Sequence, residues 1–293
     1  MNVTHHTTTG ARAIDPPFGA YALPAAAETL RRLAEHAPRR FLASGLRRLA
    51  LAGRGDGPFD CTVFGTARVR LHPRDNRTEK RVFAGVRWWD GAERARLAAA
   101  LTHTPDGVFH FVDAGANVGM YTLALRAEAQ RRGIALRALA IEPDPMNGAR
   151  LEDNLAASGA EDVRAAHCAL GAEAGTASFL SSGLTNRGEA RLTDAGETGE
   201  TGAIMVPVRP LAELVADAGL PRIDAIKMDI EGHEVPVLTG LLRDAPRAML
   251  PRLCVLEVGR DGTEAITLMQ NAGYALEFRT RLNAIMTLPP ERI

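Results

Sequence analysis

The chain has 293 residues, of which 46% are hydrophobic, so it can bury a sizeable core. Its formal net charge is zero, and the 17 basic against 9 acidic residues of residues 1–100 are scattered among apolar ones, which argues against a nucleic-acid partner. The three cysteines, Cys61, Cys168 and Cys254, are too far apart for a zinc framework. No stretch approaches the ~18 apolar residues of a membrane span. We therefore expect a cytoplasmic protein.

The N-terminal hundred residues are expected to lie outside the main domain. Residues 1–20 carry little apolar surface and lack the apolar core of a signal peptide, which predicts a disordered tail. Residues 21–105 predict an extension of helices and a hairpin. Apolar residues recur at helical spacing from Ala25 to Leu51, and Pro38 should split this segment into two helices. Short strand-like runs on both sides of Gly65 suggest the hairpin.

Three arginine pairs mark the two predicted helices: Arg31-Arg32, Arg39-Arg40 and Arg47-Arg48. We expect them to face mostly solvent, as charged faces of surface helices do. The alternative is a helix that binds an anionic membrane or a partner. A charged stretch then leads to a helix predicted from about Gly91 to Thr102.

From residue 107 onward, strand-like and helical segments alternate, which is typical of a doubly wound parallel sheet. The expected strands lie near residues 108–113, 138–142, 163–168, 223–229 and 252–258, and the expected helices near 118–132, 146–158, 211–219, 233–243 and 262–272. Two final runs, Tyr274–Phe278 and Ala284–Leu288, predict an antiparallel pair that closes the sheet. Residues 106–293 thus predict one α/β, Rossmann-like domain with a mostly parallel, seven-stranded sheet.

One polar, Gly- and Thr-rich stretch, Ser181 to Ala203, is longer than the usual connection of ~4 to 6 residues. It stands between strand-like runs at 176–180 and 204–208. It predicts either a lid over the substrate or the tip of a long hairpin with no role in function.

The segment FHFVDAGANVGMYT, residues 109–122, brings an acid and two glycines to the start of a helix. Gly115 and Gly119 allow the backbone to approach a ligand closely, and the helix N-terminus attracts an anion. The dinucleotide fingerprint has a glycine where Asn117 stands, so NAD fits poorly. The segment predicts a turn for a different nucleoside-containing cofactor.

A second acid, Glu142, ends the next apolar run 23 residues after Gly119, close to the ~20 expected for a carboxylate that binds ribose hydroxyls. A ligand with a ribose and no pyrophosphate is implied. S-adenosylmethionine meets these demands, with its carboxylate at the helix start, its ammonium at Asp113 and its ribose at Glu142. The plain alternative is a tight turn with a capping Asp.

A charged strand, DAIKMDIE at 224–231, breaks the pattern of buried parallel strands. If it stayed extended, Lys227, Asp229 and Glu231 would share one face and would have to pair or line a wet cleft. Lys227 is one of two lysines beside 33 arginines, which suggests a need for a compact ammonium.

Ligands of such sheets bind at the carboxyl ends of the strands. Four acids are expected at that rim: Asp113, Glu142, Asp229 and Glu257. His233 is expected near a helix start above the rim, as a general base, a substrate ligand or a cap. Glu231 could instead brace the turn, and Glu257 could pair with Lys227.

Four motifs in this order and spacing resemble the FkbM family of S-adenosylmethionine-dependent methyltransferases: FVDAGANVGMYT, IEPDP at 141–145, IKMDIEGHE at 226–234 and CVLEV at 254–258. The resemblance covers about residues 108–260. It implies the class I methyltransferase fold and O-methylation of a hydroxyl on a sugar, a glycolipid or a secondary metabolite.

The resemblance also implies residue roles. Asp113, Gly115, Asn117 and Gly119 would cradle the methionine moiety, Glu142 would bind the ribose, and Asp229, Glu231 and His233 would line the acceptor side. To these three we add Lys227 and Glu257, from the charged strand and the rim, as candidate catalytic residues. Two departures stand out. Pro210-Leu211-Ala212 occupies the place of a frequent T-L-D, and Ala166–Leu170 offers no carboxylate for the adenine amine, so backbone groups or His167 would have to serve.

An alcohol acceptor must lose its proton, which calls for a base or for a metal ion that lowers its pKa. Asp229 and Glu257 could hold Mg²⁺, although a base is favoured and the metal residues are unknown. Rival functions are a non-catalytic cofactor-binding module and an NAD-linked oxidoreductase. A nucleic-acid methyltransferase is disfavoured because DIEG stands where N/D-P-P-Y would be expected.

Overall fold

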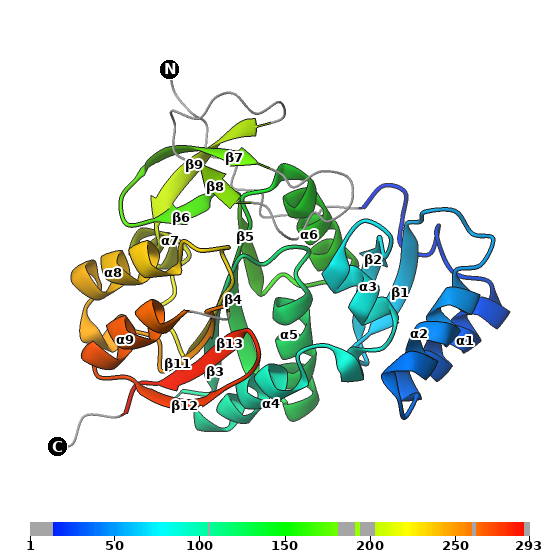
Figure 1. The fold of residues 1–293 in the computed structure, drawn as a ribbon, viewed down its shortest axis with the longest axis horizontal. Coiled ribbons are helices and arrows are strands. Elements are labelled where there is room, and N and C mark those ends of the chain that lie inside the picture. Colours follow the sequence, from blue (N-terminus) through cyan, green and yellow to red (C-terminus); the bar gives the residue numbers. More distant parts are fainter. Residues whose placement is uncertain (1–13, 105, 181–190, 194–202, 260–261, 290–293) are drawn as a thin grey trace.

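The computed structural model describes residues 14–104, 106–180, 191–193, 203–259 and 262–289 (Figure 1). The described part of the main domain is built on a 7-stranded sheet of order β12-β13-β11-β10-β3-β4-β5. Its strands are β3 Val108–Ala114, β4 Ala135–Ile141, β5 Val163–Ala166, β10 Ala225–Met228, β11 Leu253–Glu257, β12 Ala275–Arg279 and β13 Asn283–Thr287. β13 pairs antiparallel with both β11 and β12, whereas the other pairs are parallel. The predicted sheet with its antiparallel C-terminal pair is confirmed.

Helices cover both faces of this sheet (Figure 1). One face carries α4 Gly91–Ala100, α5 Met120–Arg132 and α6 Pro145–Ala157, and the other carries α7 Leu211–Asp217, α8 Glu234–Asp244 and α9 Thr263–Asn271. Each face has its own hydrophobic core. In β3, Phe111 belongs to the first core and Val112 to the second, because alternate side chains of a strand point to opposite faces. This double burial explains the continuous apolar runs of the sequence.

A second, 4-stranded sheet lies near the carboxyl end of the main sheet (Figure 1). It consists of β6 Ala169–Gly171, β7 Gly175–Leu180, β8 Arg191–Thr193 and β9 Ala203–Pro210, in the order β6-β9-β7-β8. The strand expected at 163–168 ends at Ala166, because the chain leaves the main sheet there and enters this one. The predicted strand-like runs at 176–180 and 204–208 are confirmed. Apart from β8 and the start of β9, the predicted lid lies outside the described residues.

The N-terminal extension contains α1 Ala25–His36, α2 Arg40–Ala50, β1 Phe59–Val63, β2 Ala67–Leu71, α3 Arg77–Phe83 and two 3₁₀ helices, η1 Val86–Trp88 and η2 Leu101–His103. The helix pair split at Pro38 and the hairpin are confirmed. Helix α3 was not predicted. It is short and begins at a side-chain cap, since Asn76 Oδ1 accepts hydrogen bonds from the backbone N–H groups of Thr78 and Glu79.

The arginine pairs of this extension face mostly solvent, as expected, since Arg32, Arg39, Arg40 and Arg48 are exposed, but two details differ from the expectation. Arg31 is not solvent-facing but 1% exposed, and its guanidinium pairs with Glu28 and Glu35. Residues 14–20, expected in the disordered tail, contact the hairpin, because Asp60 accepts a hydrogen bond from the backbone N–H of Gly19. Residues 1–13 lie outside the described residues, and the other domain boundaries stay predictions. No described helix is long and apolar enough to cross a membrane.

Candidate active site

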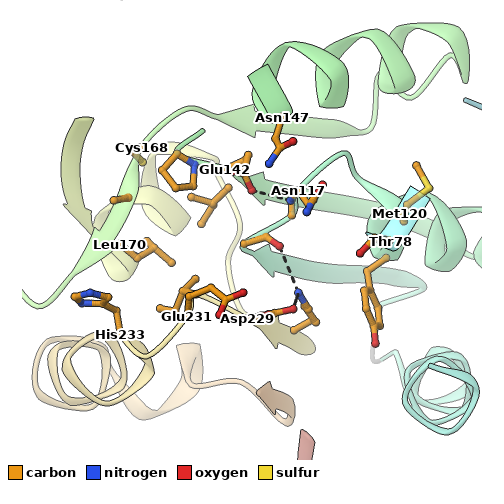
Figure 2. Close-up of a pocket in the computed structure, with 18 of the residues that line it drawn as sticks. Thr78, Asn117, Met120, Glu142, Asn147, Cys168, Leu170, Asp229, Glu231 and His233 are labelled. Atoms are coloured by element: carbon orange, nitrogen blue, oxygen red, sulfur yellow. Dashed lines mark hydrogen bonds and ion pairs between the residues drawn. The ribbon is translucent and has the colours of Figure 1, made fainter. Parts of the chain in front are cut away.

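A cavity opens at the carboxyl ends of β3, β4 and β10, with about 930 Å³ of empty space including its mouth. Figure 2 shows Glu142 and Asn117 on one side of it and Asp229, Glu231 and His233 on the other. Ligands are expected at this edge of such a sheet, and the structure brings the two predicted groups of residues into one cavity.

The turn after β3 is built by two glycines with positive φ, Gly115 at 75° and Gly119 at 84°. A Cβ on Gly115 would lie 1.8 Å from the carbonyl oxygen of Asp229, so the turn and the end of β10 touch backbone to backbone. A Cβ on Gly119, the residue before α5, would lie 2.6 Å from Leu151 Cδ1. Glycine is therefore required at 115 by space as well as by conformation.

Replacing Gly115 by Ala should destabilise the protein by about 3 kcal/mol or more, because neither backbone can yield without moving a strand end. Gly133→Ala is the matched control, since Gly133 also has a positive φ of 68° but nothing within 4 Å of its missing Cβ. Urea unfolding should therefore show a much smaller loss for Gly133→Ala. Equal losses would mean that backbone strain alone accounts for the effect.

Glu142 lines the cavity and is only 6% exposed. Its two carboxylate oxygens accept hydrogen bonds from the backbone N–H groups of Asn117, at 2.7 Å, and Asp144, at 3.0 Å. Burial raises the pKa of Glu142 to about 7, against the opposing effect of those two donors. Each oxygen keeps a lone pair, so the carboxylate can still accept hydrogen bonds from a ligand's hydroxyls.

Asp113 does not line the cavity. Its Oδ2 accepts hydrogen bonds from the backbone N–H and the hydroxyl of Thr122, which ties β3 to the first turn of α5. Its Oδ1 is buried with no hydrogen-bond partner among the described residues. Asp113 thus supports the turn, and one oxygen remains as an acceptor for an ammonium or for a water bound to one.

Part of the cavity lining is apolar and consists of Ile141, Cys168, Leu170 and Phe179. His167, considered for holding an adenine, is not part of that lining. Its Nε2 lies 2.7 Å from Glu152 Oε1, on the outside of the cavity. His167 therefore lies outside the cavity lining, and backbone contacts to an adenine stay a prediction.

Three charged residues meet at the ends of β10 and β11. The Lys227 ammonium, 6% exposed, lies 2.9 Å from Asp229 Oδ2 and 3.3 Å from the carbonyl oxygen of Gly115. The carboxyl groups of Asp229 and Glu257 share a hydrogen bond. Burial alone would raise the pKa of Asp229, but Lys227 and Glu257 hold it below its usual value. The pKa of Glu257 is raised to about 9, mainly by burial and next by the neighbouring Asp229.

The pair therefore holds one proton at neutral pH, on Glu257, and one negative charge, on Asp229. Because the pKa of Glu257 is higher in the folded protein than the usual 4.5, stability from this group is full below pH 4.5 and is lost as the pH rises toward 9. Glu257→Gln keeps a donor to Asp229 without an ionisable proton. In thermal melting scans, the melting temperature of this variant should increase relative to that of the wild type as the pH rises from 5 to 9. A constant difference would contradict the protonated state.

The expectation that Lys227, Asp229 and Glu231 share a strand face is only partly correct. β10 ends at Met228, and Glu231 has a positive φ of 53°, so it lies in a turn rather than in the strand. That turn is braced by Glu234, whose Oε1 accepts a hydrogen bond from the backbone N–H of Ile230. Glu231 lines the cavity, and Glu234, a residue that the sequence did not single out, braces the turn.

His233 precedes α8 and lines the cavity, and its side chain forms no cap hydrogen bond. Capping, one of its three predicted roles, is therefore not what the structure shows. Ligand atoms of Asp229, Glu231 and Glu257 lie within 4.8 Å of one another, a spacing that would suit a divalent cation. The Lys227 ammonium balances the charge of Asp229, and Glu257 keeps its proton, so Glu231 is the one carboxylate of the three whose charge these two do not balance.

The extension supplies a wall that the sequence did not reveal. Trp89 and Asp90 line the cavity beside Lys227 and Asp229, as does Thr78. The Tyr121 hydroxyl donates to Asp90 Oδ2 at 3.0 Å, and the Lys227 ammonium stands 5.3 Å from the centre of the Tyr121 ring. Asp90 has a positive φ of 40°, in the segment between η1 and α4.

A mostly parallel Rossmann-like sheet, closed by an antiparallel pair and bearing a cavity at its carboxyl edge, is the architecture of class I methyltransferases. Residues 113–276, more than half of the chain, match the model of the Methyltransferase FkbM domain. The chain belongs to this family of methyltransferases, as the four motifs indicated.

Two relatives carry the name methyltransferase. "Methyltransferase 1" of Beauveria bassiana (strain ARSEF 2860) is 28% identical over 193 residues, which cover 59% of this chain and 74% of that protein. "Methyltransferase sdnD" of Sordaria araneosa is 31% identical over 168 residues, covering 48% and 63%. The crystal structure of methyltransferase FkbM from Methylobacillus flagellatus KT is 19% identical, with a TM-score of 0.39, and the match covers 61% of this chain and 43% of that one.

Proposed function

We propose that this methyltransferase uses S-adenosylmethionine to methylate a hydroxyl group on a small molecule or glycan, such as a sugar, a glycolipid or a secondary metabolite. The observation that carries the proposal is the continuity of the cavity. It runs from the glycine turn and Glu142 to Lys227 and Asp229, so a ribose-bearing methyl donor and an acceptor can meet inside it.

The residues present fit the donor. Glu142 offers carboxylate oxygens to a ribose diol, and the apolar lining of Ile141, Leu170 and Phe179 can cover a flat base. The Gly115 turn, which lines the cavity and which Asp113 supports from behind, suits the amino acid end. When bound, S-adenosylmethionine supplies a methyl group on a sulfonium, open to displacement by an aligned nucleophile.

The acceptor side offers a base. Asp229 is ionised, its side chain is 37% exposed toward the cavity, and Lys227 holds only one of its oxygens. Although Glu257 also shares a hydrogen bond with this carboxylate, a lone pair of Asp229 can accept a hydrogen bond from an acceptor hydroxyl and take its proton as the hydroxyl oxygen attacks the methyl group. Glu257 keeps that carboxylate oriented, and Lys227 stabilises its charge. His233 is a second candidate for the proton acceptor.

A direct test is methyl transfer from labelled S-adenosylmethionine to a panel of hydroxylated acceptors, with titrations of S-adenosylhomocysteine and NAD in parallel. We expect S-adenosylhomocysteine binding in the micromolar range, no NAD binding and methylation of at least one alcohol. Binding of NAD instead would overturn the cofactor. Cofactor binding with no acceptor methylated would favour a non-catalytic module.

Removal of divalent cations should leave the activity unchanged. Lys227 and the proton of Glu257 already balance Asp229, so a metal ion would add charge where none is needed. The measurement compares initial rates in EDTA with rates in added Mg²⁺. A loss of activity in EDTA that Mg²⁺ restores would instead support Mg²⁺ on Asp229 and Glu257.

A further inference from the structure

The surface of the α1–α2 pair is unusually apolar. Leu33, Phe41, Leu42 and Leu49 are exposed to 53%, 64%, 42% and 59%, and they are four of the nine large apolar side chains that are strongly exposed in the described part of the chain. On α2, the side chains of Ala43 and Ala50 are buried. By the 3.6-residue period of the helix, Phe41 lies opposite this buried side, and Leu42 and Leu49 lie about a quarter turn from it. We call these four residues the apolar strip.

The charge around the apolar strip is of one sign. The segment from Ala37 to Gly55 contains no acid and five arginines. Among residues the structure describes, no carboxylate forms an ion pair with Arg39, Arg40, Arg47 or Arg48, whereas Arg32 of α1 pairs with Glu28. Burial, and then the charge of Arg48, lower the pKa of Arg47, so this guanidinium lacks a compensating anion.

We propose that the apolar strip and its arginines form a docking surface for an anionic lipid bilayer. Helices that lie in a membrane interface combine Leu and Phe on one side with arginine on the flanks, and α2, RFLASGLRRLA, has this composition. The apolar side chains enter the boundary of the acyl chains, and the arginines reach the lipid phosphates. The uncompensated positive charge favours an anionic bilayer over a second copy of this chain, whose own strip would carry the same charge.

The docking surface is linked to the cavity by a short segment. Trp88 packs against the cluster of Ala34, Ala37 and Ala43 on the helix pair. The next two residues, Trp89 and Asp90, line the cavity. Figure 1 shows α1 and α2 at the edge of the molecule beyond β1 and β2, where a flat surface can reach them. The docking surface is therefore joined through Trp88 to the wall formed by Trp89 and Asp90.

The experiment is sedimentation of the full chain with vesicles of phosphatidylcholine alone or with 30% phosphatidylglycerol added. We expect binding to the anionic vesicles only, weakened by salt because the exposed charges are screened. Phe41→Ser/Leu42→Ser/Leu49→Ser should reduce the partition coefficient by roughly tenfold or more. Arg40→Glu/Arg48→Glu should do the same through charge.

Matched controls remove similar groups elsewhere: Met205→Ser/Phe278→Ser for apolar exposure, and Arg131→Glu for charge. These should bind as the wild type does. All altered side chains are exposed, and melting temperatures and S-adenosylhomocysteine binding will report folding. No binding to anionic vesicles in low salt, or equal loss in the controls, overturns the proposal. So does a wild-type dimer that the triple serine variant abolishes, since a second copy would then be the occupant. None of these readouts depends on methyl transfer.

Discussion

Asp229→Asn is expected to lower methyl transfer by between about 10²- and 10⁴-fold while leaving S-adenosylhomocysteine affinity within several-fold of wild type. The asparagine keeps the size of the side chain but cannot take a proton. It also removes the negative charge that Lys227 and Glu257 are arranged around. Asp229 contacts the glycine turn directly through its backbone, with its carbonyl beside Gly115 and its N–H bonded to the carbonyl of Ala114, and the substitution preserves both.

Single-turnover rates and isothermal titration separate the two effects. Asp244→Asn is the matched control, since Asp244 also pairs with a basic residue, Arg243, but lies at the exposed end of α8. It should retain full activity. Full activity in Asp229→Asn would remove this residue from the catalytic set, and His233→Ala would then be the next variant to assay.

Glu142→Ala is expected to weaken S-adenosylhomocysteine binding by about 100-fold or more. A hydrogen bond to a charged group contributes roughly 1.5–3 kcal/mol, and the ribose diol would lose its acceptors. The backbone N–H groups of Asn117 and Asp144 would lose theirs as well, so the turn itself would loosen. The effect on binding should therefore exceed the loss of one ligand contact.

Titration calorimetry of Glu142→Ala should be paired with Glu152→Ala. Glu152 lies on α6 beside His167, outside the cavity lining, so its removal should leave affinity unchanged. Unchanged affinity in Glu142→Ala would mean that the ribose lies elsewhere and that the turn after β3 has another ligand.

Much of the sheet could be predicted because buried parallel strands leave continuous apolar runs, as in β3 and β11. The antiparallel end pair was predictable from two strand-like runs joined by a short polar turn. The rim acids followed from the rule that parallel strands point their carboxyl ends the same way. From this rule, Glu142 and Asp229 were correctly predicted to lie at the same edge of the sheet. The rule does not say which of the acids have side chains that line the cavity.

The remaining features depend on contacts that no local pattern encodes. Asp113 accepts two hydrogen bonds from Thr122, because the first turn of α5 offers both a hydroxyl and an N–H group. Glu231 left the strand face because the backbone turns to a positive φ there. Asp90 lines the cavity and accepts a hydrogen bond there from Tyr121, which is 31 positions away. No pattern in the sequence around Asp90 predicts this position.

The wall formed by Trp89 and Asp90 stands before residue 113, where the match to the family begins. Under the proposed function, one wall of the acceptor side is thus encoded apart from the turn that holds the methyl donor. Changes in this short segment can retune substrate choice over generations while the donor turn stays constant. Exchange of residues 85–90 between relatives is accordingly a route to new acceptors for the same chemistry.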